Sequence, residues 1–205
     1  MTHAECQWIV ERLSGTSRAQ ILDIGGGTHY DRLKVQSYVA YDLYRPLLLK
    51  KNRIVVLDRG LVNRKKDILY SVPLEILSRF VSFFPHLLAR LSSVLPLAKT
   101  IFSDCHQIPE PDERYDIVFL LNVLEHVTNP ARVLTEAVRV LKKGGFAFVS
   151  VPEICPYHPA PIDTGLRMKL DELTSFVSPY LKVFDQASVS DEPSCTVSIL
   201  SCVKE

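Results

Sequence analysis

Acidic and amide side chains recur in this sequence where short apolar runs end. Asp23 lies in the run QILDI, which leads into Gly25–Gly27, and Asp42, Asp104 and Asn122 stand at the ends of three later runs. Carboxylates accept hydrogen bonds from hydroxyls and amines and attract ammonium groups, but they repel a pyrophosphate that no nearby lysine or arginine neutralises. These residue types therefore favour a ligand with hydroxyls, an exocyclic amine and an ammonium group.

The glycine turn after the first run narrows the choice of ligand. Glycine takes backbone angles closed to other residues and lets a ligand approach the main chain. The turn has neither a GxxxxGK[ST] phosphate loop nor a complete GxGxxG pattern, because Thr28, His29 and Tyr30 follow Gly27. Together with the acids, this turn favours S-adenosylmethionine over a dinucleotide.

Strands and helices that alternate along the chain would bring these groups to one edge of a parallel sheet. Asp42 falls nineteen positions after Asp23, as a strand–helix–strand unit with a ribose-binding acid would place it. The almost wholly apolar run 115–121 is typical of a central parallel strand covered on both faces. The predicted strands are 21–24, 37–42, 100–105, 115–121 and 146–151. The predicted helices are 3–14, 28–36 and one that begins at Thr128 as N-cap and stops at Gly144-Gly145.

The C-terminal third departs from this alternation. The loop 152–167 carries four prolines and the polar residues His158, Asp163 and Arg167. A short helix is predicted at 169–177. Two last strands, near 181–187 and 195–203, lie too close together for a crossover helix, so they should pair antiparallel.

Residues 44–99 form an insert that fits the pattern poorly. The run 54–57 could be an extra strand. The stretch 73–97 is cationic and has leucine, valine and phenylalanine at helical spacing, and Pro85 and Pro96 should divide it into two helices. This amphipathic helical insert, at about 60–99, is interpreted as a cap on its own domain, with a dimer surface or an in-plane membrane contact as alternatives.

The bulk composition indicates one cytoplasmic domain over residues 1–205. Hydrophobic residues make up 47% of the 205 residues, and the formal net charge is +1, which gives no field that would recruit nucleic acid. The five cysteines form no CxxC pair and are interpreted as reduced thiols. Neither a secretory signal nor a membrane-spanning run is apparent.

The motifs resemble those of class I S-adenosylmethionine-dependent methyltransferases of the small-molecule type. The matching segments are LDIGGGT, VAYDLY, the block from FSDCHQIPEPDERYDIVFLLNVLEHV to GGFAFVSVP, and the two C-terminal strands. The resemblance implies an α/β fold: a Rossmann-like, doubly wound, mainly parallel seven-stranded sheet with an antiparallel C-terminal strand. The implied reaction transfers a methyl group from S-adenosylmethionine to a small-molecule acceptor, with S-adenosylhomocysteine as product.

By the same resemblance, each strand end receives a role in binding the cofactor. Asp23 and Gly25, Gly26 and Gly27 would hold the methionine moiety, and Asp42 the ribose hydroxyls. Asp104 would bind the adenine amine, Cys105 the adenine ring through its backbone, and Asn122 would line the sulfonium end. The neighbours Ile24, Leu43 and His106 complete the predicted cofactor site.

A general base is needed only where the acceptor is a hydroxyl or a protonated amine. The candidates are His126, for which a packing role is the alternative, and His158, in a loop that should overlook the methyl-transfer edge. Glu125 and His126 resemble a metal-binding pair, but adjacent residues rarely ligate one ion, so no metal is predicted. A non-catalytic cofactor-binding domain and a protein or nucleic-acid methyltransferase remain alternative functions.

Overall fold

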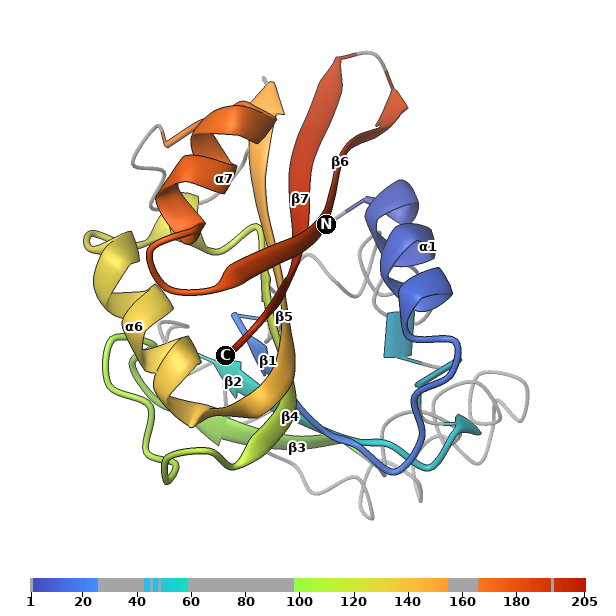
Figure 1. Ribbon diagram of the computed structural model, residues 1–205, viewed down its shortest axis with the longest axis vertical. Coiled ribbons are helices and arrows are strands. Elements are labelled where there is room, and N and C mark those ends of the chain that lie inside the picture. The colour runs from blue at the N-terminus through green and yellow to red at the C-terminus, as the bar shows by residue number, and fades with distance from the viewer. Residues whose placement is uncertain are drawn as a thin grey trace, which may run out of the picture.

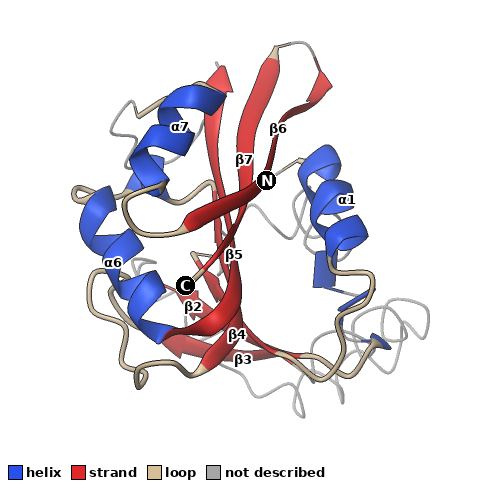
Figure 2. Ribbon diagram, in the orientation of Figure 1, coloured by secondary structure: helices blue, strands red, loops and turns tan. Residues whose placement is uncertain are grey.

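The described residues of the computed structural model form a seven-stranded sheet with helices on both faces (Figures 1 and 2). They are 2–25, 43–44, 46–47, 49–58, 98–154, 166–192 and 194–205. The strand order is β3-β2-β1-β4-β5-β7-β6. The strands are β1 (Gln20–Ile24), β2 (Arg53–Asp58), β3 (Ala98–Phe102), β4 (Tyr115–Leu121), β5 (Leu141–Ile154), β6 (Lys182–Glu192) and β7 (Cys195–Val203).

The pairing of the strands confirms the predicted fold class. Strands β1 to β5 pair in parallel, whereas β7 pairs antiparallel with both β5 and β6. Because a parallel sheet gathers the carboxyl ends of its strands at one edge, the ends of β1, β2, β4 and β5 face the same side of the molecule.

Two apolar layers hold the helices against the sheet. Helices α6 (Pro130–Val140) and α7 (Leu170–Val177) pack on one face, and α1 (His3–Arg12) packs on the other (Figure 1). Under α1 the rings of Trp8, Phe148 and Phe119 meet edge to face, with centroids 6.1 and 5.7 Å apart. Strand β4 is buried along nearly its whole length, as expected of a central strand. None of the described helices is long and apolar enough to cross a membrane.

The strand beside β1 differs from the predicted one. The run 54–57, considered from the sequence as a possible extra strand, lies within β2 (Arg53–Asp58), which pairs along all of β1. The predicted strand 37–42 lies outside the described residues, as does the amphipathic part of the insert at about 60–99, apart from residues 98–99. Strand β3 starts at Ala98, inside the predicted insert, and ends at Phe102, so Asp104 follows the strand instead of closing it.

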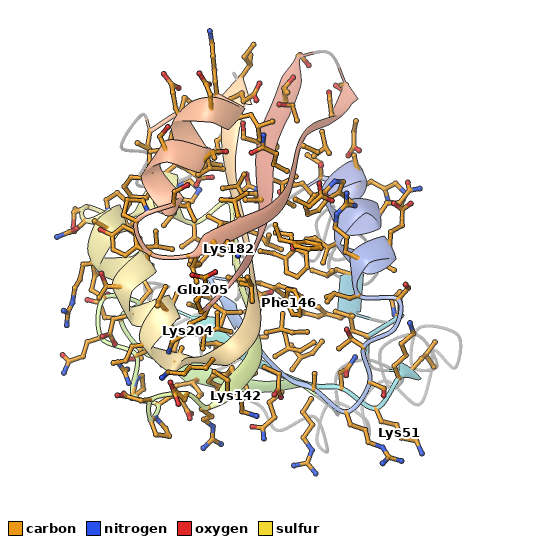
Figure 3. All side chains as sticks on the ribbon, in the orientation of Figure 1. Lys51, Lys142, Phe146, Lys182, Lys204 and Glu205 are labelled. Atoms are coloured by element: carbon orange, nitrogen blue, oxygen red, sulfur yellow. The ribbon has the colours of Figure 1, made fainter. Side chains whose placement is uncertain are left out.

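Helix α6 begins and ends at other residues than predicted. Its N-cap is Asn129, not Thr128: Asn129 Oδ1 accepts from the Arg132 N–H at 3.0 Å, and Pro130 opens the helix. The helix ends at Val140, where Lys204 Nζ donates to the carbonyls of Val138 and Leu141, at 2.9 and 2.7 Å (Figure 3). Residues 141–154 form one long β5, and the predicted stop at Gly144 instead donates its N–H to the Lys204 carbonyl, at 2.7 Å.

Candidate functional site

The first strand ends in a buried acid and a glycine with a positive φ. Asp23 is 3% exposed and accepts a hydrogen bond from the Tyr44 hydroxyl. Gly25 has φ +73°, and a Cβ built there would lie 2.7 Å from Val123 Cγ2, just beyond β4. Its N–H donates to the Leu57 carbonyl at 2.8 Å. Only glycine fits between these neighbouring strands, so the main chain can approach a ligand closely there.

Asn122 follows β4 in a backbone conformation that residues other than glycine rarely adopt. Its φ is +52°, a left-handed value that asparagine tolerates better than most residues. The Asn122 N–H donates to the Ser150 carbonyl at 3.1 Å, which ties it to β5. The Asn122 Nδ2 donates to Glu5 Oε1 at 2.8 Å, and the Ser150 hydroxyl donates to the same oxygen at 2.7 Å. A side chain from α1 therefore reaches the carboxyl edge of the sheet.

The loop after β3 brings three polar side chains together. Asp104 Oδ1 accepts the His106 N–H at 2.9 Å and lies 2.6 Å from His106 Nδ1. Cys105 between them is buried, and one carboxylate oxygen, the thiol and an imidazole nitrogen lie within 4.8 Å of one another. This donor set could hold a metal ion, whereas the predicted role of the three residues is to contact adenine.

Three side chains of α6 brace that loop, and one of them, Arg132, donates its Nε–H to the His106 carbonyl at 3.2 Å. Glu136 Oε2 accepts the Ile108 N–H at 3.0 Å and the Arg139 Nη2 at 2.9 Å. Arg139 also donates to the carbonyls of Glu110 and Ile108, at 2.9 and 2.8 Å. The Arg139 guanidinium holds the pKa of the Glu136 carboxyl below its usual range, so the acid stays ionised. The brace fixes the segment that follows Asp104–His106.

Glu125 and His126 stand in a turn of 3-10 helix, η4 (Leu124–His126), three residues beyond β4. Glu125 is fully buried, and burial raises the pKa of its carboxyl to about 8; the nearby Glu5 acts in the same direction and Arg167 opposes it. His126 Nε2 lies 3.7 Å from Glu125 Oε1. A protonatable acid and an imidazole therefore follow Asn122 by three and four positions in the sequence.

The structure places some of the predicted residues together and leaves others undescribed. Asp23, Gly25 and Asn122 share the carboxyl edge, and Asp104, Cys105 and His106 form the loop after β3. Ile24 and Leu43 are fully buried in the two apolar layers, so their side chains serve packing. Gly26, Gly27, Asp42 and His158 lie outside the described residues, and their roles stay predictions.

Three residues at this edge were absent from the predicted site. Asp58 ends the strand beside β1, the place expected for a ribose-binding acid. Glu5 and Ser150 reach Asn122 from α1 and β5. Thr2 and Glu5 form a capping box in the structure, and the pattern Thr2-x-x-Glu5 can indicate a helix start, but nothing in it indicates a partner 117 residues away.

A methyltransferase family matches part of the chain. Residues 80–149 match the family described as "Methyltransferase domain". A probable S-adenosylmethionine-dependent methyltransferase of Mycobacterium tuberculosis is 32% identical over 94 residues, which cover 43% of this chain and 34% of that protein. The mitochondrial ubiquinone biosynthesis O-methyltransferase of Candida albicans is 54% identical over 43 residues, or 21% of this chain and 13% of that protein. The chain thus spans about a third or less of these relatives.

The whole fold is also similar to a solved structure. A SAM-dependent methyltransferase from Aquifex aeolicus superposes with a TM-score of 0.61 at 14% identity, covering 97% of this chain and 89% of that one. At this identity the likeness concerns the fold alone. It extends over the described sheet, including the antiparallel β7.

Proposed function

We infer that this chain is a class I S-adenosylmethionine-dependent methyltransferase and that it transfers a methyl group to a small-molecule acceptor; its fold and its matched segment support this inference. The carrying observation is the sheet order β3-β2-β1-β4-β5-β7-β6, which brings Asp23, Gly25 and Asn122 to one edge. Acidic side chains beside a tight glycine turn, without a phosphate loop, suit a ligand that carries an ammonium group and hydroxyls. They suit the pyrophosphate of a dinucleotide less well.

The residues at this edge fit the cofactor in distinct ways. Asp23 is buried beside the glycine turn, where a carboxylate would attract the ammonium group of the methionine moiety. Gly25 lets the main chain come close to it. Asp42 or Asp58 would accept hydrogen bonds from the ribose hydroxyls, and the Asp104–His106 loop would contact adenine.

The bound cofactor supplies an activated sulfonium methyl, so the protein needs mainly to place an acceptor in line with the carbon–sulfur bond. The acceptor atom donates a lone pair to the methyl carbon as the bond to sulfur breaks, and the sulfur keeps that electron pair. A hydroxyl or ammonium acceptor must also lose a proton, which His126 or His158 would take.

A small molecule is the acceptor class best supported. The Candida albicans relative is named for ubiquinone biosynthesis, and a net charge of +1 offers no attraction to nucleic acid. Strand β4 is followed by Asn-Val-Leu-Glu instead of the Asn/Asp-Pro-Pro-aromatic motif of enzymes that methylate flipped base amines.

Binding of S-adenosylhomocysteine tests this function. At a concentration about 100 times its Kd, the ligand should stabilise the native state by about 2.7 kcal/mol and raise the Tm by roughly 5–10 °C. Gly25→Ala and Asp104→Ala should abolish the shift in Tm. The matched control is Asp171→Ala, at an exposed position of α7. Comparing Asp42→Ala with Asp58→Ala identifies the ribose acid.

A shift with NADH and none with S-adenosylhomocysteine would refute the proposal. Transfer of labelled methyl from S-adenosylmethionine to a fractionated metabolite pool would then identify the acceptor. Cofactor binding with no transfer to metabolites, protein or nucleic acid would favour the non-catalytic alternative.

A further inference from the structure

Glu5 joins the N-terminal helix to the ends of two central strands. It is fully buried although it is an acid on the first turn of α1. Its Oε1 accepts from Asn122 Nδ2 at 2.8 Å and from the Ser150 hydroxyl at 2.7 Å, while Oε2 accepts the Thr2 N–H at 2.5 Å. A buried carboxylate is costly without such donors, so this arrangement has one well-defined geometry.

The contact determines which way the Asn122 amide faces. An ionised carboxylate can only accept hydrogen bonds, so the amide must turn its Nδ2 donor toward Glu5. Its Oδ1 acceptor is then directed away from Glu5. An oxygen in this place, immediately after β4, suits a ligand group that carries partial positive charge, including polarised C–H groups.

We propose that Glu5 is a positioning residue of the methyl-transfer site and fixes the amide of Asn122 at the edge where the methyl group is transferred. The inference rests on the proposed function, because it assigns to Glu5 an effect on a cofactor bound beside Asn122. Glu5 itself need not touch the cofactor.

The position of Glu5 is itself secured by the far end of the chain. Asp191 accepts the N–H groups of His3 and Ala4, at 2.6 and 2.7 Å, with both carboxylate oxygens. Arg12, the last residue of the helix, pairs with Asp185 at 2.5 Å and stacks 3.5 Å over the Trp8 ring. Helix α1 is therefore fixed at both ends, and the Glu5 carboxylate cannot drift from Asn122 without breaking these contacts.

A purely structural role for Glu5 would give other results. Glu5 is also part of the capping box with Thr2, whose hydroxyl accepts the Glu5 N–H at 3.1 Å. Loss of a cap lowers stability, but it should leave the Asn122 amide in place. Thr2→Ala is thus a matched control, because it weakens the same helix start without removing the partner of Asn122.

A double-mutant cycle on S-adenosylhomocysteine affinity, measured by calorimetry, tests the proposal. Glu5→Ala should weaken binding about 10-fold or more, in the range seen when a supporting hydrogen-bond partner is removed. In an Asn122→Ala background the same change should have little further effect, because Glu5 acts through that side chain. Thr2→Ala should lower the Tm and leave the affinity within about 2-fold, well inside the effect expected for Glu5→Ala.

A spectroscopic measurement on the wild type needs no variant that could fail to fold. The Asn122 side-chain amide, assigned through its connection to the Asn122 backbone signals, should show proton exchange at least about 10-fold slower than exposed asparagines, because its donor is partly buried and hydrogen-bonded to Glu5. Exchange at the rate of exposed asparagines would overturn the inference.

The two proposals fail in different ways. Wild-type protein that does not bind S-adenosylhomocysteine would refute the proposed function. Wild-type binding together with an unchanged affinity in Glu5→Ala, or with additive effects of Glu5→Ala and Asn122→Ala, would refute the positioning role alone.

Discussion

Among single residues, Glu125 has a protonation state that should control stability. Burial raises the pKa of its carboxyl from 4.5 to about 8 in the folded protein. Below pH 4.5 both the folded and the unfolded chain hold the proton. Between pH 4.5 and about 8 only the folded chain holds it, so the stabilising contribution of this proton decreases as the pH rises through that window.

Glu125→Gln should remove this pH dependence. The neutral amide cannot ionise, so the free energy of unfolding should fall less steeply between pH 5 and 8, by at most about 1.4 kcal/mol per pH unit. Urea unfolding at several pH values measures the slopes. Glu11→Gln, on the exposed face of α1, should keep the wild-type slope; an identical slope in Glu125→Gln would contradict the raised pKa.

Individual residues also show where sequence reasoning was sufficient. Gly25 was predicted from the strand and turn around it, because the need for a positive φ is local. The bond from Glu5 to Asn122 could not be predicted, because it joins residues 117 positions apart. Glu5 has an ordinary local role in the capping box, which already accounts for a glutamate at this position. The sequence therefore gives no reason to expect its hydrogen bond to Asn122 as well.

Among the elements, α6 positions the loop that carries Asp104, Cys105 and His106. Its Glu136 and Arg139 bind backbone groups of Ile108 and Glu110, and Arg139 also pairs with Asp112 at 2.6 Å. The loop is thus held by a nearly buried acid whose charge is neutralised by one arginine. Loss of that arginine would leave the acid buried without its main partner.

Arg139→Met should therefore destabilise the protein by about 2–4 kcal/mol and weaken S-adenosylhomocysteine binding through the loop. The comparison on the same helix is Arg132→Met, whose more exposed side chain (53%) lies 3.8 Å from Glu136 and makes one hydrogen bond to the loop, at the His106 carbonyl. That substitution should cost less than about 1 kcal/mol. Denaturant unfolding compares the two, and equal losses would show that Arg139 has no bracing role.

Elements with strong local signals were predicted well. Strands β4 and β7 have the predicted bounds, because β4 is an almost wholly apolar run and a polar turn precedes β7. Strand β5 is longer than predicted because its first residues pair with β4 at Tyr115 and its last with β7 at Thr196, contacts that depend on distant strands. The place of β2 beside β1 was not predicted, because four apolar residues in an insert do not indicate their neighbour.

For the molecule as a whole, the hairpin of β6 and β7 closes the sheet and holds α1 against it (Figure 1). Asp191, near the tip of the hairpin, supplies an anion at the N-terminal end of α1, where the helix dipole favours one. The sequence predicted the hairpin and the helix separately. The contact between the hairpin and α1 depends on the folded sheet, so no local sequence pattern predicts it.

Asp191→Ala should cost about 1 kcal/mol of stability, because two backbone N–H groups at the helix start lose their acceptor. If Glu5 depends on the placement of α1, amide exchange at Asn122 should also become faster. Glu192→Ala, on the neighbouring exposed residue, should change neither quantity. Native-state hydrogen exchange reports both effects, and unchanged protection of α1 in Asp191→Ala would contradict the anchoring role.

The anchoring of α1 by residues far along the chain has a consequence for biosynthesis. Its partners Asp185 and Asp191 are 173 to 188 positions downstream. The ribosome makes α1 before these partners, so the contacts that anchor the two ends of the helix cannot form until β6 has been made. A chain cut short before β6 would therefore lack both anchors of α1, and the proposed positioning of Asn122 by Glu5 would be weaker in it.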